Sequence, residues 1–345
     1  MASMRAARVT GPAQINILDL PIPRPGPGEV LVRVVAYAPY GTDVGVYLNR
    51  GGRYVAEYPV GIGADFSGVV QEVGAGVTQV AIGDRVCALA LDHCGACRNC
   101  QRGKTNLCLD PAYSKVPRQS CCQQYTLVSS RKLARLPASL SFEDGAMLAG
   151  IVDALNAYEK LGIAAGQRLA VIGVGAMGLS AVATAVALGY DVVAIGGTGK
   201  RADLAAQLGA RSVIRLSRHD EDVSPLALAS TPNGFDFVIE TTASAWGLQQ
   251  AFAVAGMEGA VAVTGGTAAI PLTGWDLVQR ELRIVGIRAG HHQEQALALI
   301  AAGRIDLKPT IAARFPLERA ADAFALLSGE HAADVGRVII QVSDA

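Results

Sequence analysis

A short apolar run at 169–172 leads into a glycine-rich turn. A run of this length between turn residues is typical of a strand buried on both faces. An apolar helical pattern follows at 179–188, and a second apolar strand at 191–195. Because strands that alternate with helices pair side by side in one direction, this succession predicts a parallel sheet.

The same alternation of strands and helices continues to about Arg288. Its later strands are predicted at 212–216, 235–239, 259–264 and 282–287. Before about Pro137 the pattern changes to short β-branched runs between glycine turns, at 30–35, 66–73 and 85–91. Short strands separated by frequent glycines predict a barrel-like β domain.

Two further stretches are predicted to be helical. Ser141 to Asp144 carries an N-cap signal that leads into a helix over 145–160, which links the β domain to the alternating region. After Ala289, helices are predicted at 293–302 and 317–327, and a final strand at 337–342.

The turn after the first apolar strand carries three glycines with GxGxxG spacing. They are Gly173, Gly175 and Gly178, with Ala176 and Met177 between the last two. In such a turn the glycines permit a tight bend, close approach of the backbone to a pyrophosphate, and tight helix–strand packing. Because the motif lies between a strand and a helix, it predicts a dinucleotide site rather than an ordinary strand–helix turn.

The end of the second strand indicates which nucleotide binds. Enzymes that use NAD usually place Asp or Glu there, to hold the ribose 2′-hydroxyl. Here the strand is followed by Gly196, and then by Thr198, Lys200 and Arg201. No carboxylate repels a 2′-phosphate, and two cations and a hydroxyl are available to bind one. The predicted cofactor is NADP(H).

Composition and charge narrow the class of protein. The 345 residues suit two domains, and an apolar fraction of 51% can build large cores. The formal net charge is zero, so nucleic acid is not an expected partner. No apolar stretch predicts a membrane span or a secretory signal. We expect a cytoplasmic protein that acts on a small molecule.

Four of the seven cysteines lie close together in the sequence. Cys94, Cys97, Cys100 and Cys108 are separated by two, two and seven residues. Four thiolates at this spacing can close a tetrahedral zinc shell, and a closed shell is structural because it leaves no position for substrate. An iron–sulfur cluster also uses four thiolates, and incidental cysteines of a surface loop are the other alternative. We predict one structural Zn²⁺.

The remaining cysteines and one histidine pair have simpler interpretations. Adjacent Cys121 and Cys122 are predicted to pack in the β domain, and Cys87 lies in a strand pattern. His291 and His292 are interpreted as part of a turn.

Taken together, these features resemble the medium-chain, zinc-containing alcohol dehydrogenase superfamily over essentially the whole chain. The resemblance includes the PGPGEVLV stretch at 25–32, GAGVTQVAIGDRV at 74–86, the four-cysteine loop, the GVGAMG turn and the AAGRIDLKPTI segment ending at Ile311. It implies a GroES-like β-barrel catalytic domain and a Rossmann doubly wound parallel-sheet domain. We place the first at 1–152, with 289–345 returning to it, and the second at 153–288. The resemblance also implies hydride transfer in a cleft, and homodimers or homotetramers.

The chain departs from this family where the family binds a second, catalytic zinc. The family's ligand Cys precedes a Gly-Thr-Asp-like triplet, and here that residue is Tyr40. The family's Gly-His-Glu triplet is here Gly63-Ala64-Asp65, and the third ligand aligns near Ala149. Catalytic zinc needs three donors from Cys, His, Asp or Glu, and His93 is the one histidine in the first 218 residues. We therefore expect no catalytic zinc.

The resemblance also suggests which residues replace the metal. Tyr40 occupies the position of a ligand, Thr42 matches the family's proton-relay hydroxyl, and Asp65 replaces the carboxylate beside the ligand His. Each has a structural alternative. Tyr40 fills the space that the metal leaves, Thr42 bonds to its own turn, and Asp65 pairs with a nearby Arg or Lys.

Five further residues are candidates for cofactor contacts because of the resemblance. Thr241, Thr242 and Gly265 follow predicted strands, where the family meets the nicotinamide half. Arg288 and Arg337 are candidates for the cofactor phosphates, with surface ion pairs as the alternative.

These observations support one hypothesis about the function and leave two alternatives. The first is an NADPH-dependent reductase that transfers hydride, without zinc, to an activated double bond of an enone, quinone or iminium. The second is an NADP-dependent alcohol or sugar dehydrogenase, a ketone or aldehyde reductase with an atypical metal site. The third, from another class, is a non-enzymatic NADPH-binding sensor or assembly partner.

Overall fold

A computed structural model describes residues 2–49, 57–88, 91–110, 120–164, 166–197, 199–218, 220–265 and 269–344. Contacts within the chain divide it into two units. The first comprises Met1–Ala149, Gln293–Gly303 and Ile311–Ala345, and the second comprises Gly150–His292 and Arg304–Thr310.

The first unit is built on two sheets. A larger sheet has the order β15-β16-β3-β5-β6-β8, with β7 also paired to β3. Its strands are antiparallel except for the parallel pair β15 and β16. A smaller sheet has the order β2-β1-β4. The strands are β1 (Ser3–Gly11), β2 (Gln14–Pro21), β3 (Glu29–Tyr37), β4 (Val60–Gly61), β5 (Phe66–Val73), β6 (Arg85–Ala88), β7 (Tyr125–Ser129), β8 (Leu133–Arg135), β15 (Ile311–Pro316) and β16 (Arg337–Gln341).

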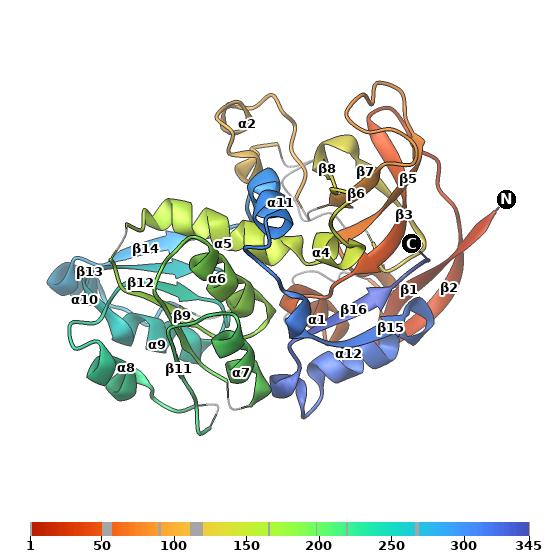
Figure 1. Ribbon diagram of the computed structural model, residues 1–345. Helices are drawn as coiled ribbons and strands as arrows, with labels where there is room; N and C mark the ends of the chain where they lie inside the picture. The colour runs from red at the N-terminus through yellow and green to blue at the C-terminus, as the bar shows by residue number, and fades with distance from the viewer. Residues whose placement is uncertain are drawn as a thin grey trace. The chain divides into compact units, whose positions relative to one another are not determined.

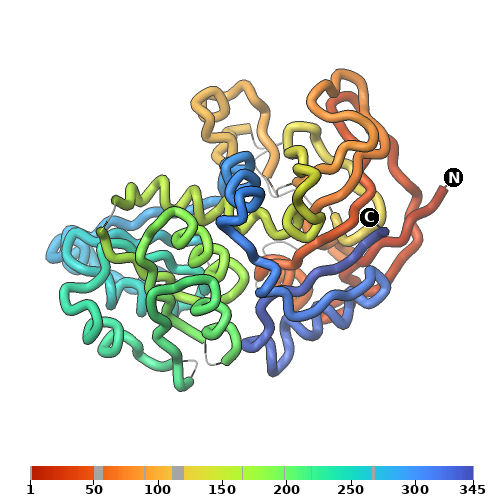
Figure 2. Tube along the Cα trace, in the orientation of Figure 1, coloured from red at the N-terminus to blue at the C-terminus, as the bar shows by residue number. Residues whose placement is uncertain are grey.

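The end of the chain completes this first unit. Figure 2 shows the C-terminal segment, in blue, running beside N-terminal strands in red and orange, and β16 pairs with β3 through Ile340 and Tyr37. One apolar core joins the strands to α12 through residues such as Phe66 and Phe324. Helical segments of this unit are α1 (Gly41–Tyr47), α2 (Arg98–Gln101), α4 (Phe142–Ala146), α11 (Gln293–Ala301) and α12 (Ala320–Ser328), with short 3-10 turns at Thr105–Leu107, Ser130–Lys132, Leu317–Arg319 and Ala332–Asp334.

The second unit contains one six-stranded parallel sheet with the order β11-β10-β9-β12-β13-β14 (Figure 1). The order reverses between β9 and β12, and ligands of doubly wound sheets bind at the carboxyl ends of the strands beside such a switch point. The strands are β9 (Leu169–Ile172), β10 (Val192–Ile195), β11 (Ser212–Ile214), β12 (Phe235–Glu240), β13 (Ala255–Val263) and β14 (Arg283–Gly286).

Helices cover both faces of this sheet because alternate residues of its strands point to opposite sides. Leu169 and Val171 pack on one side with α5 and α6, whereas Ala170 and Ile172 pack on the other side with α8 and α9. Burial on both faces explains why β9 is an unbroken apolar run. The helices of this unit are α5 (Leu148–Leu161), which begins in the first unit, α6 (Ala176–Ala187), α7 (Lys200–Gln207), α8 (Ser224–Ser230), α9 (Ala245–Val254), α10 (Gly274–Arg280) and a 3-10 turn at Lys308–Thr310.

The mixed α/β architecture predicted from the sequence is confirmed. Ser141 caps α4, with its side chain accepting from the backbone N–H of Asp144. The single predicted helix over 145–160 is instead two helices, because α4 ends at Ala146, with Met147 as its C-cap, and α5 begins at Leu148. Cys121 and Cys122 are buried in the core of the first unit, as predicted. None of the described helices is long and apolar enough to cross a bilayer.

Candidate active site and metal centre

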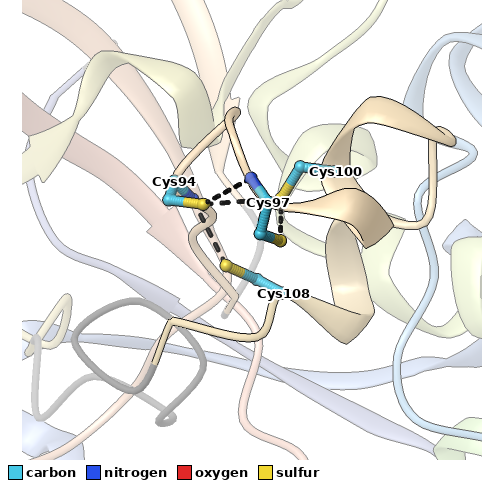
Figure 3. A group of neighbouring side chains, drawn as sticks. All are labelled: Cys94, Cys97, Cys100 and Cys108. Carbon is cyan, nitrogen blue, oxygen red and sulfur yellow. Dashed lines mark hydrogen bonds between the residues drawn. The ribbon is translucent and has the colours of Figure 1, made fainter.

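The four-cysteine loop of the first unit holds its four sulfur atoms close together (Figure 3). Cys97 caps the short helix α2, Cys100 lies within it, and Cys108 follows the 3-10 turn at Thr105–Leu107. The side-chain amide of Asn99 donates to the carbonyl of Leu107 at 2.7 Å and ties the two turns together. Local turns, rather than the sheet, therefore position the sulfurs.

The spacing of the sulfurs fits a single ion. The donor atoms all lie within 4.8 Å of one another, with Cys97 and Cys100 Sγ at 3.4 Å and Cys94 and Cys100 Sγ at 3.9 Å. Sulfurs around a tetrahedral zinc with Zn–S bonds of about 2.3 Å lie about 3.8 Å apart. An iron–sulfur cluster holds its cysteine sulfurs farther apart, so these distances favour zinc.

Backbone amides stabilise the ionised form of two of these thiols. The N–H groups of Ala96 and Cys97 donate to Cys94 Sγ, and the N–H of Leu109 donates to Cys97 Sγ. Backbone hydrogen bonds from Leu109 and Cys100 lower the pKa of Cys97 to about 6, and the bond from Ala96 lowers the pKa of Cys94. Burial raises the pKa of Cys100 to about 12, and a coordinated metal would hold this thiol deprotonated. The residues fit a closed, structural zinc shell.

The glycine turn of the second unit is packed as a dinucleotide turn requires. Gly173 has φ +95°, and a Cβ at Gly178 would lie 1.9 Å from the carbonyl oxygen of Gly173. At Gly175, by contrast, an added Cβ would meet only one atom of the described residues within 4 Å, an Arg201 guanidinium nitrogen at 3.8 Å. The first and third glycines are therefore needed for packing, whereas the second leaves open space at the N-terminus of α6, which Ala176 and Met177 begin.

The end of β10 lies beside this turn. An added Cβ at Gly196 would lie 3.4 Å from the backbone of Gly173, and φ is +135° at Gly196 and +79° at Gly197. Side chains rarely adopt these backbone angles, so the structure disfavours a carboxylate at either position. Lys200 and Arg201 form the first turn of α7, and Thr198 lies outside the described residues.

The threonines after β12 serve the turn in which they lie. The Thr241 hydroxyl donates to the carbonyl of Ile172 at 2.8 Å, which joins the ends of β12 and β9 at the switch point. The Thr242 backbone N–H and hydroxyl both donate to the Glu240 carboxylate. Glu240 is fully buried, which raises its pKa, and no motif in the sequence singled it out. Both predicted cofactor hydroxyls thus bind the chain itself.

Gly265 and Arg288 are the last two predicted contacts of the second unit. Gly265 follows β13, and an added Cβ there would lie 2.3 Å from the Cβ of Ala243. Arg288 is exposed after β14.

Tyr40 is held at the start of α1 by bonds at both ends. Its backbone N–H donates to the Asp43 carboxylate at 2.8 Å. Its hydroxyl donates to the carbonyl of Met147 at 3.1 Å and accepts from the Arg337 guanidinium at 3.2 Å. Met147 lies two residues before Ala149, so the Tyr40 hydroxyl reaches toward the segment that aligns with the third zinc ligand.

Arg337, which was predicted as a candidate for the cofactor phosphates, is buried rather than exposed. It is 1% exposed on β16 of the first unit, and its guanidinium carbon lies 5.4 Å from the centre of the Tyr40 ring. A buried guanidinium stabilises negative charge on a phenol oxygen that it contacts. This pair is the feature of the site that local sequence reasoning missed.

Thr42 and Asp65 lie in different environments. Thr42 is exposed in the first turn of α1. Asp65 lies between β4 and β5, near Lys132. Burial lowers the pKa of Lys132 to about 8, while the charge of Asp65 opposes that shift. No pattern in the sequence marked Lys132, because its burial depends on residues far away along the chain.

Two protein-family models match this chain, one in each half. Residues 26–138 match the alcohol dehydrogenase GroES-like domain, and residues 176–302 match the zinc-binding dehydrogenase family. The L-threonine 3-dehydrogenase of Bacillus licheniformis is 32% identical over 89% of this chain and 90% of its own length. The sorbitol dehydrogenase of Bacillus subtilis is 30% identical over 93% of this chain and 92% of its own length.

Solved structures agree with this assignment. A protein from Sinorhizobium meliloti 1021, solved with bound NADP, has a TM-score of 0.86 and 28% identity, and covers 99% of this chain and 100% of its own. A thermostable alcohol dehydrogenase from Pyrobaculum aerophilum has a TM-score of 0.85 at 28% identity, with the same coverage.

Proposed function

The chain belongs to the medium-chain dehydrogenase/reductase superfamily and is an NAD(P)-dependent oxidoreductase, and we propose that it uses NADPH to reduce an activated double bond without a catalytic metal. The acceptor class is a conjugated enone, a quinone or an iminium. These acceptors are electrophilic without a Lewis acid, whereas oxidation of a simple alcohol without a metal would lose the ion that stabilises the alkoxide.

The observation that carries the proposal is the Tyr40 hydroxyl bonded to the Arg337 guanidinium at the position of a metal ligand. Among the described residues, the groups of three or more metal-binding side chains are the four cysteines and a Glu159–His291–His292 group. Neither includes Tyr40, Asp43 or Asp65. The donors expected of a catalytic zinc are replaced by a phenol and an alanine pair, Ala64 and Ala149.

The chemistry that the residues can perform follows from this arrangement. NADPH, held at the glycine turn, would supply a hydride for the β-carbon of an enone, whose double-bond electron pair would move toward the carbonyl oxygen. The Tyr40 hydroxyl then gives its proton to the resulting enolate, and Arg337 stabilises the phenolate that remains. Solvent returns a proton to Tyr40, so the sum is acceptor, NADPH and one proton giving the saturated product and NADP⁺.

Replacement of Tyr40 by Phe tests the proton donor. Tyr40→Phe should lower kcat by about 10²-fold or more with an enone, while the NADPH affinity stays unchanged. Tyr190→Phe is a matched control, because it also removes a hydroxyl bonded to a carbonyl, that of Ile163 at 3.4 Å. Wild-type kcat in Tyr40→Phe would remove this hydroxyl from the mechanism.

The choice of NADPH rests on the cation beside the glycine turn. Arg201→Ala should raise the Kd of NADPH at least tenfold and leave that of NADH within about twofold, because NADH has no 2′-phosphate. Arg211→Ala is the control, since Arg211 is an exposed arginine of the same unit that pairs with Asp191. Equal losses for both nucleotides would contradict the proposal.

One second candidate is favoured by the relatives, which are sorbitol, L-threonine and sugar-acid dehydrogenases. It is an NADP-dependent alcohol or sugar dehydrogenase whose atypical ligands hold a metal. This reaction would be lost on treatment with a chelator that leaves the protein folded. Turnover of an enone that survives the same treatment would favour the metal-free reductase.

A further inference from the structure

Three metal-binding side chains of the second unit converge outside the site described above. His292 Nε2 lies 2.7 Å from Glu159 Oε2, and His291 Nε2 lies 3.9 Å from the same oxygen. The two imidazole rings have centroids 4.3 Å apart, and the three donor atoms all lie within 4.8 Å of one another. We call Glu159, His291 and His292 the histidine–glutamate cluster.

The cluster is held by α5 and by the chain that follows β14 (Figure 1). Asn156, fully buried on α5, donates from its side-chain amide to the carbonyl of Ala289. Gly290 lies directly on the same helix, where an added Cβ would be 2.3 Å from the carbonyl of Val152. Asn156 and Glu159 are three residues apart, so they project from one face of α5. The histidines therefore follow a segment that is already fixed to the helix that carries Glu159.

The donor distances fit an ion after small side-chain movements. Donors of a tetrahedral zinc, with metal–ligand bonds of about 2.0–2.1 Å, lie about 3.3–3.4 Å apart. The observed 2.7 and 3.9 Å lie on either side of this value, so the two histidine–glutamate pairs would each change by about 0.6 Å. Glu159 has its side chain 45% exposed, which permits this movement and gives an ion a path from solvent.

The set of donors indicates which ion would bind. Two imidazoles and one carboxylate are the ligands of open zinc sites, in which water takes a remaining position. Imidazole donors select divalent transition metals over Mg²⁺ and Ca²⁺, which prefer oxygen. We propose that the histidine–glutamate cluster is a second metal site of this protein, which binds Zn²⁺ separately from the four-cysteine site and links the segment after β14 to α5.

The test is a metal count on the full-length protein, without an added histidine tag and with its four-cysteine site filled with zinc. After dialysis, the protein is titrated with Zn²⁺ and, in parallel, with Co²⁺, whose absorption spectrum reports the ligand type. Wild type should bind a second equivalent. Cobalt there should show ligand-field bands without the sulfur-to-cobalt charge-transfer band of a cysteine site.

Variants locate the second ion. His292→Ala and the double variant His291→Ala/His292→Ala should lose the second equivalent, and Glu159→Gln should weaken it at least tenfold. His331→Ala, which removes an exposed histidine of the first unit, should bind two equivalents as wild type does. Retention of the four-cysteine zinc in every variant shows that the fold is intact.

Two results would overturn the proposal. One is a wild type that takes a single equivalent even in millimolar Zn²⁺, and the other is a second equivalent that persists in the double variant. The inference does not rest on the proposed reaction, and turnover of an enone has no part in the readout. The two proposals can therefore fail separately.

Discussion

The sharpest test of the dinucleotide turn compares two of its own glycines. In Gly178→Ala the new Cβ would lie 1.9 Å from the carbonyl oxygen of Gly173, and 2.9 Å from the Thr241 hydroxyl. Ordinary contact begins near 3.4 Å, so the carbonyl would have to move by 3.4 − 1.9 = 1.5 Å. Gly173 has φ +95° and directly follows Ile172 at the end of β9, whose carbonyl accepts the Thr241 hydroxyl. Overpacking of this kind costs about 3 kcal/mol or more.

Gly175→Ala changes the same loop without this clash. Gly175 has φ −75° and ψ −171°, which alanine adopts freely, and the new Cβ would be 3.8 Å from Arg201. The free energy of unfolding should therefore stay within about 1 kcal/mol of wild type. The methyl group would, however, occupy the space where the backbone is expected to approach a pyrophosphate. We expect NADPH binding to weaken at least tenfold, or by about 1.4 kcal/mol.

Thermal melting without nucleotide and a fluorescence titration with NADPH separate the two effects. Gly178→Ala should melt about 6–12 °C below wild type, from about 2–4 °C for each kcal/mol in a unit of this size. Gly175→Ala should melt close to wild type and fail in the titration. The reasoning is wrong if Gly178→Ala melts as wild type does, or if both variants lose the same stability.

Two further predictions concern the first unit. Cys97→Ser should abolish binding of one zinc per chain and lower the melting temperature. Cys87→Ser removes a buried strand thiol outside the four-cysteine loop and should keep the zinc. Elemental analysis and thermal melting measure both effects. Lys132 has a pKa of about 8 in the folded protein, against 10.5 for the free side chain. The unfolded chain therefore binds this proton more tightly, and the free energy of unfolding should rise between pH 8 and pH 10.5. The gain is up to about 3 kcal/mol. The difference between wild type and Lys132→Met in urea unfolding at several pH values isolates this contribution, and an equal pH slope in both proteins would refute it.

The parts of the fold that were predictable are those in which burial produces a local pattern. β9 is buried on both faces, and the apolar run at Leu169–Ile172 matches it residue for residue. β1 and β2, which the sequence did not single out, form a sheet in which apolar and polar residues are mixed, as in QINILDLP of β2. β15 alternates half-buried and exposed residues, and its pairing with β16 crosses α12 in the chain. Such strands carry only a short alternating pattern, and their burial depends on the partners that cover them.

The candidate sites follow the same rule: their local patterns could be predicted, and their contacts between distant residues could not. The four cysteines lie within fifteen positions, so their spacing alone indicated the zinc shell that the sulfur positions support. The glycine turn was likewise local. Arg337, however, reaches Tyr40 across 297 positions, and Glu159 meets His292 across 133. One sequence shows an arginine in a strand and a histidine pair near a turn, and nothing in it states what either contacts.

Contacts at long sequence separation also decide which chemistry a family member retains. The substitutions at Tyr40, Ala64 and Ala149 are visible in the sequence, and they argue only for what has been lost. In the proposed reaction Tyr40 takes over with the support of Arg337, a cation 1% exposed that can stabilise a phenolate but cannot bind a metal. An Arg337→Met variant separates the two roles of Tyr40. If Tyr40 donates a proton, kcat should fall and its dependence on pH should shift, because the phenolate loses its partner. If Tyr40 only fills space, the variant should change stability and leave that dependence as it is in wild type.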